Sequence, residues 1–140
     1  MKLQVKKLHR DAKLPQFAHD SDAGLDLCTP IEVTVKAGER GLLPTGISLA
    51  IPTGYVGLIW DKSGVSNKLG LKVLGGVVDA GYRGEILVGL LNTSNSDHTF
   101  APGDKIAQML IQKVEHPEII EVTELDNTER GEGAFGSTGK

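Results

Sequence analysis

The chain has 140 residues, 39% of them hydrophobic, which is enough for one domain with its own core. Its formal net charge of −3, with acidic and basic residues intermixed, argues against nucleic-acid binding, which needs a basic face. The single Cys28 excludes an internal disulfide, no apolar run approaches the ~20 residues that span a bilayer, and MKLQVKKLHR lacks a signal-peptide core. We expect a cytoplasmic protein.

Short apolar runs separated by Gly and Pro predict an all-β fold. In chain order, the expected strands cover residues 3–7, 31–35, 46–51, 55–60, 72–78, 84–91 and 105–114. One short helix is expected from Ser63 to Lys68, with Ser63 as its N-cap and Gly70 as its terminator. Residues 115–129 form an acidic connector in this interpretation. The pattern predicts a β-barrel or a double-sheet jelly roll of many short strands.

The stretch RGEGAFGSTGK at residues 130–140 contains too much Gly to build a core. It is either a frayed tail or a flexible flap that becomes ordered on an anionic ligand.

The stretch WDKSGVSNKLG places Lys62, Ser63 and Gly64 at the start of the expected helix. Unpaired N–H groups, a hydroxyl and an ammonium group could together hold a phosphate there. The alternative is an ordinary helix cap in a loop.

In GGVVDAGYRGE, Asp79 ends an apolar strand just before a Gly-containing turn. It is either a turn former or a carboxylate fixed on a hairpin and directed at a water. Tyr82 could present its ring to a ligand, and Gly75 and Gly76 could let a ligand approach the backbone. Further along, strand alternation predicts that Gln108 shares a face with Ile106 and Leu110, where its amide needs a structural or ligand partner.

Read in order, five stretches resemble the five motifs of the trimeric deoxyuridine triphosphatases (dUTPases). They are DAGLDL (22–27), DKSGVSNKLG (61–70), GGVVDAGYRGE (75–85), GDKIAQMLI (103–111) and RGEGAFGSTG (130–139). The resemblance covers nearly the whole chain. It implies a jelly-roll barrel over residues 1–129, a flap over residues 130–140 that closes on the active site, and a homotrimer whose active sites are each built from three subunits.

The resemblance also implies the reaction, which is hydrolysis of dUTP to dUMP and pyrophosphate. This reaction keeps uracil out of DNA and supplies dUMP for thymidylate synthesis. Asp79 would be the general base for a water that attacks the α-phosphate. Mg²⁺ would bind the triphosphate, and Asp26 would contact the waters of the metal.

The same resemblance assigns the binding residues. Tyr82 would stack on the deoxyribose and leave no room for a 2′-hydroxyl. Phosphate contacts are implied for Lys62, Ser63, Gly64 and Gln108. Backbone hydrogen bonds to uracil are implied for the hairpin around Gly76, Val77, Val78 and Asp79. From the flap, the implied contacts are Arg130 to the phosphates, Phe135 stacked on uracil, and donors from Gly136 and Ser137.

Four positions depart from the family pattern, of which Ala134, in place of a common Gly of the tail, is the smallest change. Lys62 stands where the second motif commonly has Arg, and Asp61 before it is expected to point away or to pair with a lysine. Val73 stands where many bacterial members carry Asn, so the uracil contact would rest on backbone alone.

Two alternatives remain open. One is a dCTP deaminase of the same fold, in which Glu85 would take part in the chemistry. Tyr82 and the FGSTG tail favour a dUTPase, because the deaminases usually have Phe at the first position and lack such a tail. The other alternative is a non-catalytic barrel that serves as an interaction module.

Overall fold

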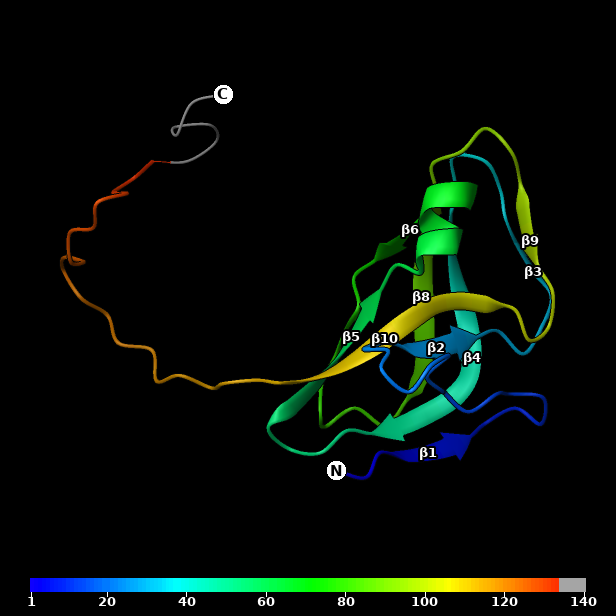
Figure 1. Cartoon of the computed structure of the whole chain (residues 1–140), viewed down its shortest axis with the longest axis horizontal. Helices are drawn as coiled ribbons and strands as arrows, with labels where there is room; N and C mark the ends of the chain where they lie inside the picture. The colour runs from blue at the N-terminus through cyan, green and yellow to red at the C-terminus, as the bar shows by residue number, and fades with distance from the viewer. Residues whose placement is uncertain (134–140) are drawn as a thin grey trace.

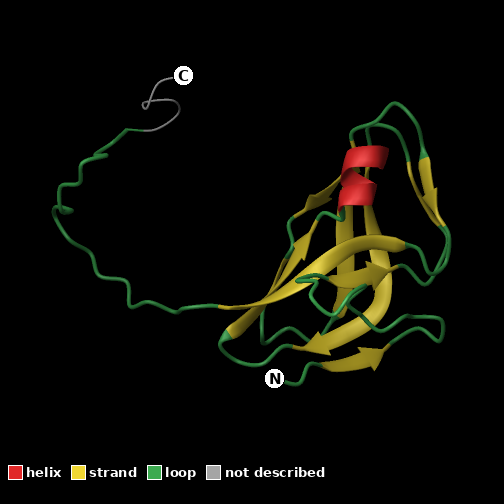
Figure 2. Cartoon of the chain, viewed as in Figure 1, coloured by secondary structure: helices red, strands yellow, loops and turns green. Residues whose placement is uncertain are grey.

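The computed structural model describes residues 1–133, which form an almost entirely β structure with one short π-helix (Figure 2). The strands are β1 (Gln4–Lys7), β2 (Leu25–Cys28), β3 (Val33–Val35), β4 (Arg40–Ala50), β5 (Tyr55–Trp60), β6 (Leu71–Leu74), β7 (Val77–Val78), β8 (Glu85–Asn92), β9 (His98–Phe100) and β10 (Lys105–Lys113). The helix η1 spans Gly64–Lys68. The all-β prediction is confirmed.

The strands form two four-stranded sheets, ordered β1-β4-β8-β6 and β2-β10-β5-β7, and a separate β3–β9 pair (Figure 1). Within residues 1–133 neither sheet closes into a barrel. One hydrophobic cluster joins the two sheets, with Leu43, Val88 and Leu90 from the first and Ile106 and Met109 from the second, all of them fully buried. The core therefore lies between two sheets, as in a jelly roll.

Strand β4 is much longer than the predicted strand at residues 46–51. Pro44 and Gly46 look like turn residues in the sequence, yet Pro44 pairs with Leu87 inside β4. β1 pairs only with residues 47–50, so no strand of residues 1–133 lies beside Pro44 on that side of β4. The missing N–H of proline therefore costs no hydrogen bond to a neighbouring strand there. The register shifts between Pro44 and Ser48, and Gly46 has a φ of 67° within this irregularity.

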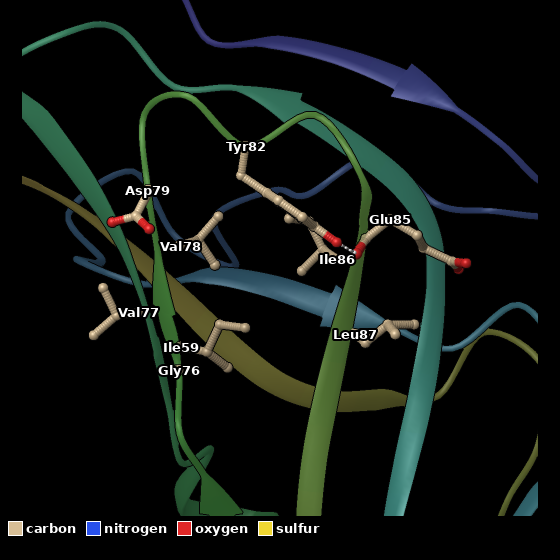
Figure 3. A pocket seen from close by; sticks show the side chains of 9 residues that line it. All are labelled: Ile59, Gly76, Val77, Val78, Asp79, Tyr82, Glu85, Ile86 and Leu87. Atoms are coloured by element: carbon tan, nitrogen blue, oxygen red, sulfur yellow. Dashed lines mark hydrogen bonds between the residues drawn. The ribbon is translucent and has the colours of Figure 1, made fainter.

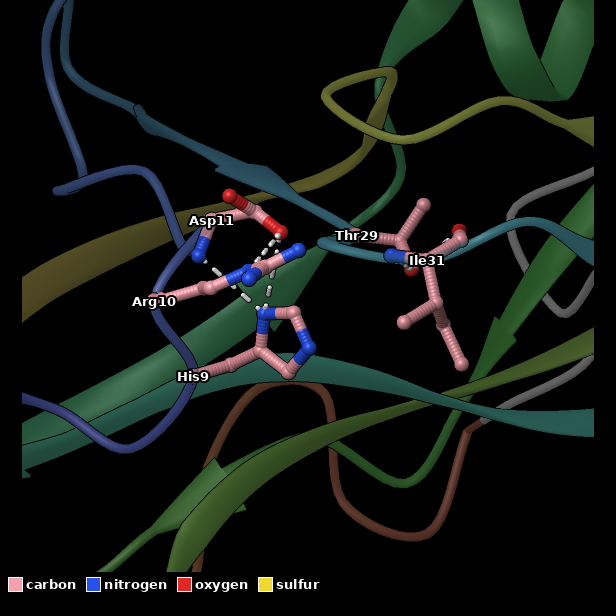
Figure 4. A network of polar contacts seen from close by, with 5 residues as sticks. All are labelled: His9, Arg10, Asp11, Thr29 and Ile31. Carbon is pink, nitrogen blue, oxygen red and sulfur yellow. Dashed lines mark hydrogen bonds and ion pairs between the residues drawn. The ribbon is translucent and has the colours of Figure 1, made fainter.

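The turn after β1 packs against this irregularity in β4 (Figure 4). Within it, the backbone N–H of Asp11 donates to His9 Nδ1 at 3.1 Å, and Arg10 Nε donates to Asp11 Oδ2 at 3.2 Å. A Cβ on Gly46 would come within 2.8 Å of the His9 Cβ, so only glycine allows this approach. Across from the turn, Thr29 Oγ1 donates to the carbonyl of Ile31 at 3.1 Å. Ile31, expected within a strand, is exposed because β3 begins only at Val33.

The apolar run KVLGGVV divides into two strands of different sheets. Gly75 and Gly76, with φ values of 70° and 114°, turn the chain between β6 and β7. β7 pairs with β5, whereas β8 pairs with β4 and β6. The predicted antiparallel pairing of the two apolar runs is present between β6 and β8, but β7 and Asp79 lie on the long connection between them, which crosses to the other sheet.

Strand β10 contains a β-bulge that reverses the expected alternation. Its register against β2 shifts between Lys105 and Ala107. Ile106 and Ala107 are consecutive and both fully buried, while Gln108 is only half-buried. Gln108 therefore does not share its face with Ile106, as the sequence had predicted, because the bulge inserts an extra residue.

After β10 the chain leaves the sheets as an extended segment (Figure 1). Residues 114–133 form no helix or strand, which confirms the predicted connector. Its large apolar side chains are strongly exposed: Ile119, Ile120, Val122 and Leu125. In residues 1–133 no helix is long and apolar enough to cross a membrane. Phe135, Gly136 and Ser137, and with them most of the expected flap, lie outside the described residues.

Candidate functional site

A cavity of about 230 Å³ lies beside the segment that connects β7 to β8 (Figure 3). Apolar side chains from both sheets form its base, and the connecting segment forms its rim. Its lining residues are Ile59, Gly76, Val77, Val78, Asp79, Tyr82, Glu85, Ile86 and Leu87. The structure thus brings together the four residues that the third motif assigned to uracil and catalysis, with Tyr82 beside them.

Asp79 lies at the rim of this cavity with its side chain exposed. Its backbone carbonyl accepts a hydrogen bond from the N–H of Tyr82 at 3.0 Å, which closes a tight turn. No group in residues 1–133 donates a hydrogen bond to its carboxylate. The turn therefore fixes the Asp79 backbone and leaves the carboxylate to accept from water or a ligand.

Tyr82 folds back over the start of β8 (Figure 3). Its hydroxyl donates to the carbonyl oxygen of Glu85 at 3.0 Å. A Cβ on Gly84 would lie 2.3 Å from the Tyr82 hydroxyl, so the absence of a side chain at residue 84 creates the space for the ring. Gly84 was not among the predicted site residues, although it stands within the third motif.

Gly76 lines the cavity and also has a structural role between two strands. A Cβ at this residue would lie 2.6 Å from the carbonyl oxygen of Ile59, and the N–H of Ile59 donates to the Gly76 carbonyl at 2.7 Å. Gly76 therefore allows β7 to approach β5 closely. The same approach fixes the backbone of Val77 and Val78 along the cavity.

Glu85, the residue on which the deaminase alternative depends, has a structural partner. Its Oε1 accepts a hydrogen bond from the N–H of Gly46 at 2.8 Å. Figure 3 shows its carboxylate pointing away from Asp79. Glu85 thus holds the irregular part of β4 against β8.

A second cavity, of about 500 Å³, is lined by Asp22, Ala23, Gly24, Asp26, Trp60, Asp61, Lys62, Gln108 and Leu110. Strand pairing builds it, because Asp26 of β2 lies opposite Gln108 of β10, which lies opposite Trp60 of β5. Directly opposite side chains share a face of the sheet. The structure therefore brings together Asp26, Lys62 and Gln108, three residues expected to handle phosphates or metal.

Asp26 is the most constrained carboxylate in this cavity. It is 6% exposed, and it forms ion pairs with Lys62 through Oδ1 and with Lys105 through Oδ2, each at 2.6 Å. Burial raises the pKa of Asp26, but the hydrogen bonds from Lys105 and Lys62 outweigh burial and leave this pKa below its usual value. Asp26 is therefore held in its ionised form.

Ser63 and Gly64 lie at the exposed start of η1. Ser63 occupies the N-cap position but makes no side-chain capping bond, whereas Gly70 follows the helix with a φ of 72°, as predicted for a terminator. Asp61 forms an ion pair with Lys72 at 2.5 Å and accepts from the N–H of Val73 at 2.7 Å. The expectation that Asp61 pairs with a lysine is confirmed.

Gln108 has a structural partner and a cavity-facing position at once. Its Nε2 donates to the backbone carbonyl of Asp61 at 2.8 Å. A Cβ on Gly24 would lie 2.2 Å from Gln108 Oε1, so Gly24 makes room for this amide. The side chain is thereby held between β2 and the start of η1.

The two cavities open on different sides of β5. Ile59 lines the first and its neighbour Trp60 lines the second, because successive side chains of a strand point to opposite faces. The segment that follows β10 and bears Arg130 leads away from the two sheets (Figure 1). The Nε of Arg130 donates to the carbonyl of Gly133 at 2.9 Å. Within a single chain, therefore, Asp79, Lys62 and Arg130 do not lie together in one site.

Asp26 is the residue expected to contact a metal ion through water. In residues 1–133 no three His, Cys, Asp or Glu side chains come together as a metal cage. Each Asp26 oxygen accepts one lysine and retains a second lone-pair direction, which suits contact with the waters of an ion. The donors fit Mg²⁺ that is carried mainly by substrate phosphates and water.

A family model described as dUTPase matches residues 10–139. The chain belongs to the dUTPase family. A curated relative, the deoxyuridine 5′-triphosphate nucleotidohydrolase of Mycolicibacterium gilvum, is 49% identical over 98% of this chain and 94% of its own length. Curated relatives of this name point to the dUTPases rather than to the deaminase alternative or a non-catalytic module.

Solved dUTPase structures share the fold. A single-residue variant of the dUTPase of Staphylococcus bacteriophage 80alpha, determined with dUpNHpp, superposes with a TM-score of 0.94 at 31% identity, covering 99% of both chains. A variant dUTPase from phage phi11 of S. aureus, described as revealing the coordination of a structural Mg(II) ion, has a TM-score of 0.85 at 29% identity and covers 91% of this chain and 100% of that chain. The jelly-roll prediction is confirmed by these likenesses.

Sequence reasoning missed one charged partner and two glycines of the site: Lys105, Gly24 and Gly84. Only the position of the glycines within recognised motifs could have indicated them. Lys105 also stands within a recognised motif, GDKIAQMLI, but its contact with Asp26 depends on the bulge in β10.

Proposed function

We propose that this chain hydrolyses dUTP to dUMP and pyrophosphate. One observation carries the proposal: in a chain of the dUTPase family, the exposed Asp79 carboxylate lies at the rim of a cavity formed by the β7 backbone. A carboxylate without a protein donor is suited to accept a proton from a water beside the α-phosphate. We assign the roles below on this basis.

Asp79 acts as the general base and orients the attacking water. A positioned base of this kind contributes about 10²–10⁴-fold to the rate. The tight turn from Asp79 to Tyr82 holds its backbone, so the carboxylate needs little reorganisation when a nucleotide arrives.

Uracil is read by the backbone of Gly76, Val77 and Val78. Strand pairing with β5 fixes this backbone, so it cannot move aside for a larger base. A C5-methyl group would therefore clash with β7. A rigid clash excludes thymine more strongly than the loss of a methyl contact, which gives only ~10–200-fold discrimination.

The deoxyribose stacks on the Tyr82 ring. The hydrogen bond to the Glu85 carbonyl and the space at Gly84 keep the ring in place. A 2′-hydroxyl would then meet the ring without a hydrogen-bond partner, which disfavours UTP.

Lys62, Ser63, Gly64 and Gln108 bind the phosphates. Lys62 supplies charge, Ser63 supplies a hydroxyl that no cap occupies, and Gln108 supplies an amide fixed by Asp61. Asp26 would contact the waters of Mg²⁺ bound to the triphosphate, and the ion would supply charge neutralisation there.

The active site is completed in a homotrimer. The Asp79 cavity and the Lys62 cavity open on different sides of β5, and the segment that bears Arg130 leads away from both. Assembly of three copies lets one copy supply Asp79, another the phosphate-binding residues and a third the tail. From that tail, Arg130 contacts the phosphates, Phe135 stacks on uracil, and Gly136 and Ser137 add donors.

The test is pyrophosphate release from dUTP, UTP, dTTP and dCTP, with and without Mg²⁺. Release from dUTP alone, with ¹⁸O from labelled water appearing in dUMP and not in pyrophosphate, is expected for attack on the α-phosphate. Ammonia release from dCTP would instead support the deaminase alternative. Absence of any release, with a tail that stays protease-sensitive in the presence of dUpNHpp, would support an interaction module.

A further inference from the structure

The bulge in β10 changes which side chains of this strand face the phosphate cavity. Between Lys105 and Ala107 the strand gains one residue relative to β2, and both Ile106 and Ala107 point into the core. Lys105 and Gln108 consequently lie on the same outer face, although regular alternation would separate them. That face also carries Asp26, which pairs with Gln108 in the β2–β10 register.

Lys105 reaches Asp26 from outside the cavity. Its Nζ lies 2.6 Å from Asp26 Oδ2, whereas Lys62 Nζ lies 2.6 Å from Oδ1. Lys62 lines the cavity and Lys105 does not. The two lysines therefore share one carboxylate, and of the two only Lys62 is among the residues that line the cavity.

The charges of this group favour release of Lys62. Two ammonium groups and one carboxylate carry a net charge of +1. If Lys62 were the only partner of the buried Asp26, its transfer to a phosphate would leave a desolvated carboxylate without a counter-ion, at considerable cost. With Lys105 present, Asp26 keeps one ion pair when Lys62 leaves.

We propose that Lys105 is a positioning residue that retains Asp26 and so frees Lys62 to donate to a substrate phosphate. The inference rests on the proposed function, because it concerns the phosphate contacts of the same site. It also bears on the lysine at residue 62, because the compact charge of its ammonium group is attracted by both Asp26 and a phosphate.

The test compares Lys105→Met with Lys105→Arg and with the control Lys72→Met. Lys72 also pairs with a carboxylate beside the cavity, but with Asp61 instead of Asp26. Lys105→Met is expected to raise the Kd for dUpNHpp and the KM for dUTP by about tenfold, equivalent to about 1.4 kcal/mol, while kcat changes less. Lys105→Arg should restore binding, and Lys72→Met should leave it unchanged. If Lys105→Met does not fold, Lys105→Gln carries the same expectation.

A double-mutant cycle with Asp26→Asn separates positioning from a direct charge effect. Without a carboxylate to hold Lys62, the Lys105→Met change should alter the Kd for dUpNHpp by less than about twofold. A tenfold loss in both backgrounds would mean that Lys105 acts on the phosphates itself and would overturn the proposal. An unchanged Kd in the Lys105→Met single variant would overturn it equally.

The two proposals fail in different ways. If the unaltered chain neither binds dUpNHpp nor releases pyrophosphate from dUTP, the proposed function fails. If the unaltered chain does both and the Lys105 variants behave like it, only the role of Lys105 fails.

Discussion

Two aspartates, Asp79 and Asp26, occupy opposite environments in the same molecule. Asp79 is exposed on a turn between two sheets, and no group in residues 1–133 donates to its carboxylate. Asp26 is buried within a sheet, and both of its carboxylate oxygens accept from lysines. The resemblance gives the two aspartates different expected roles, and the structure shows the different environments that go with them.

The difference separates chemistry from positioning. A carboxylate that must take a proton needs an open lone pair and a rigid backbone, which Asp79 has. A carboxylate held ionised by two cations is a poor base but a good anchor for them, which describes Asp26. We therefore propose different roles for these two carboxylates, set by their environments, as in other hydrolases.

The strongest test of this separation is Asp79→Asn. The amide cannot accept the proton of the attacking water, so we expect kcat for dUTP to fall by about 10²–10⁴-fold while the Kd for dUpNHpp stays within about threefold. Glu85→Gln is the matched control, because Glu85 lines the same cavity but bonds to Gly46. Full turnover in Asp79→Asn would show that Asp79 is not the general base.

A smaller effect is expected from Gly84→Ala, which tests the rim of the Asp79 cavity. The new Cβ would lie 2.3 Å from the Tyr82 hydroxyl, so the ring must move. We expect the ratio of kcat/KM for dUTP over UTP to fall by about tenfold. Gly81→Ala is the control on the same turn, because its Cβ would meet no atom within 4 Å. Equal dUTP-to-UTP ratios in the two variants would show that Gly84 does not contribute to discrimination against UTP.

A still smaller effect is expected from Gly24→Ala on the Asp26 side. The added methyl would displace the flexible end of Gln108, whose Oε1 lies 2.2 Å from the new Cβ. We expect KM for dUTP to rise by about threefold with little change in kcat. Gln108→Ala should show a similar rise, and the double variant should add nothing to it. An additive loss would show that Gly24 does not act through Gln108.

The smallest effect concerns stability alone. Burial raises the pKa of Asp61, but Lys72 and the N–H of Val73 outweigh burial and lower this pKa below its usual 3.8. A lowered pKa adds stability above the unfolded value that is lost as the pH falls through the folded value. Asp61→Asn should therefore unfold with a free energy roughly 0.5–1 kcal/mol lower at neutral pH.

Urea unfolding at a fixed protein concentration measures this difference. It should stay constant from about pH 7 to 5 and shrink below about pH 4. A difference that grows in acid would contradict the sign of the Asp61 pKa shift. The kcat of Asp61→Asn should remain unchanged, which distinguishes this carboxylate from Asp79.

Much of the fold was predictable because the relevant signals are local. Alternating apolar residues located β5, β8 and β10, and Gly70 marked the end of η1. Only the second half of β4 was predicted. Pro44 and Gly46 resemble turn residues, but in the structure they belong to an edge strand whose register shifts between Pro44 and Ser48. The division of KVLGGVV between two sheets depends on pairing with β5 and β8, which no local pattern reveals.

The site was predictable as a set of motifs and not as an arrangement. Motif order identified Asp79, Lys62 and Gln108, but it did not show that Asp79 and Lys62 lie on different sides of β5. The contact between Asp26 and Lys105 joins residues far apart in the chain and depends on the bulge. Such contacts follow from the register of distant strands, which a single sequence does not specify.

The central claim is tested most directly by a crystal structure of the chain with dUpNHpp and Mg²⁺. The account predicts a water about 2.6–3.2 Å from the Asp79 carboxylate, in line with the bond from the α-phosphorus to the bridging nitrogen. An Asp79 side chain turned to bulk solvent, with no water between it and the α-phosphorus, would contradict the account.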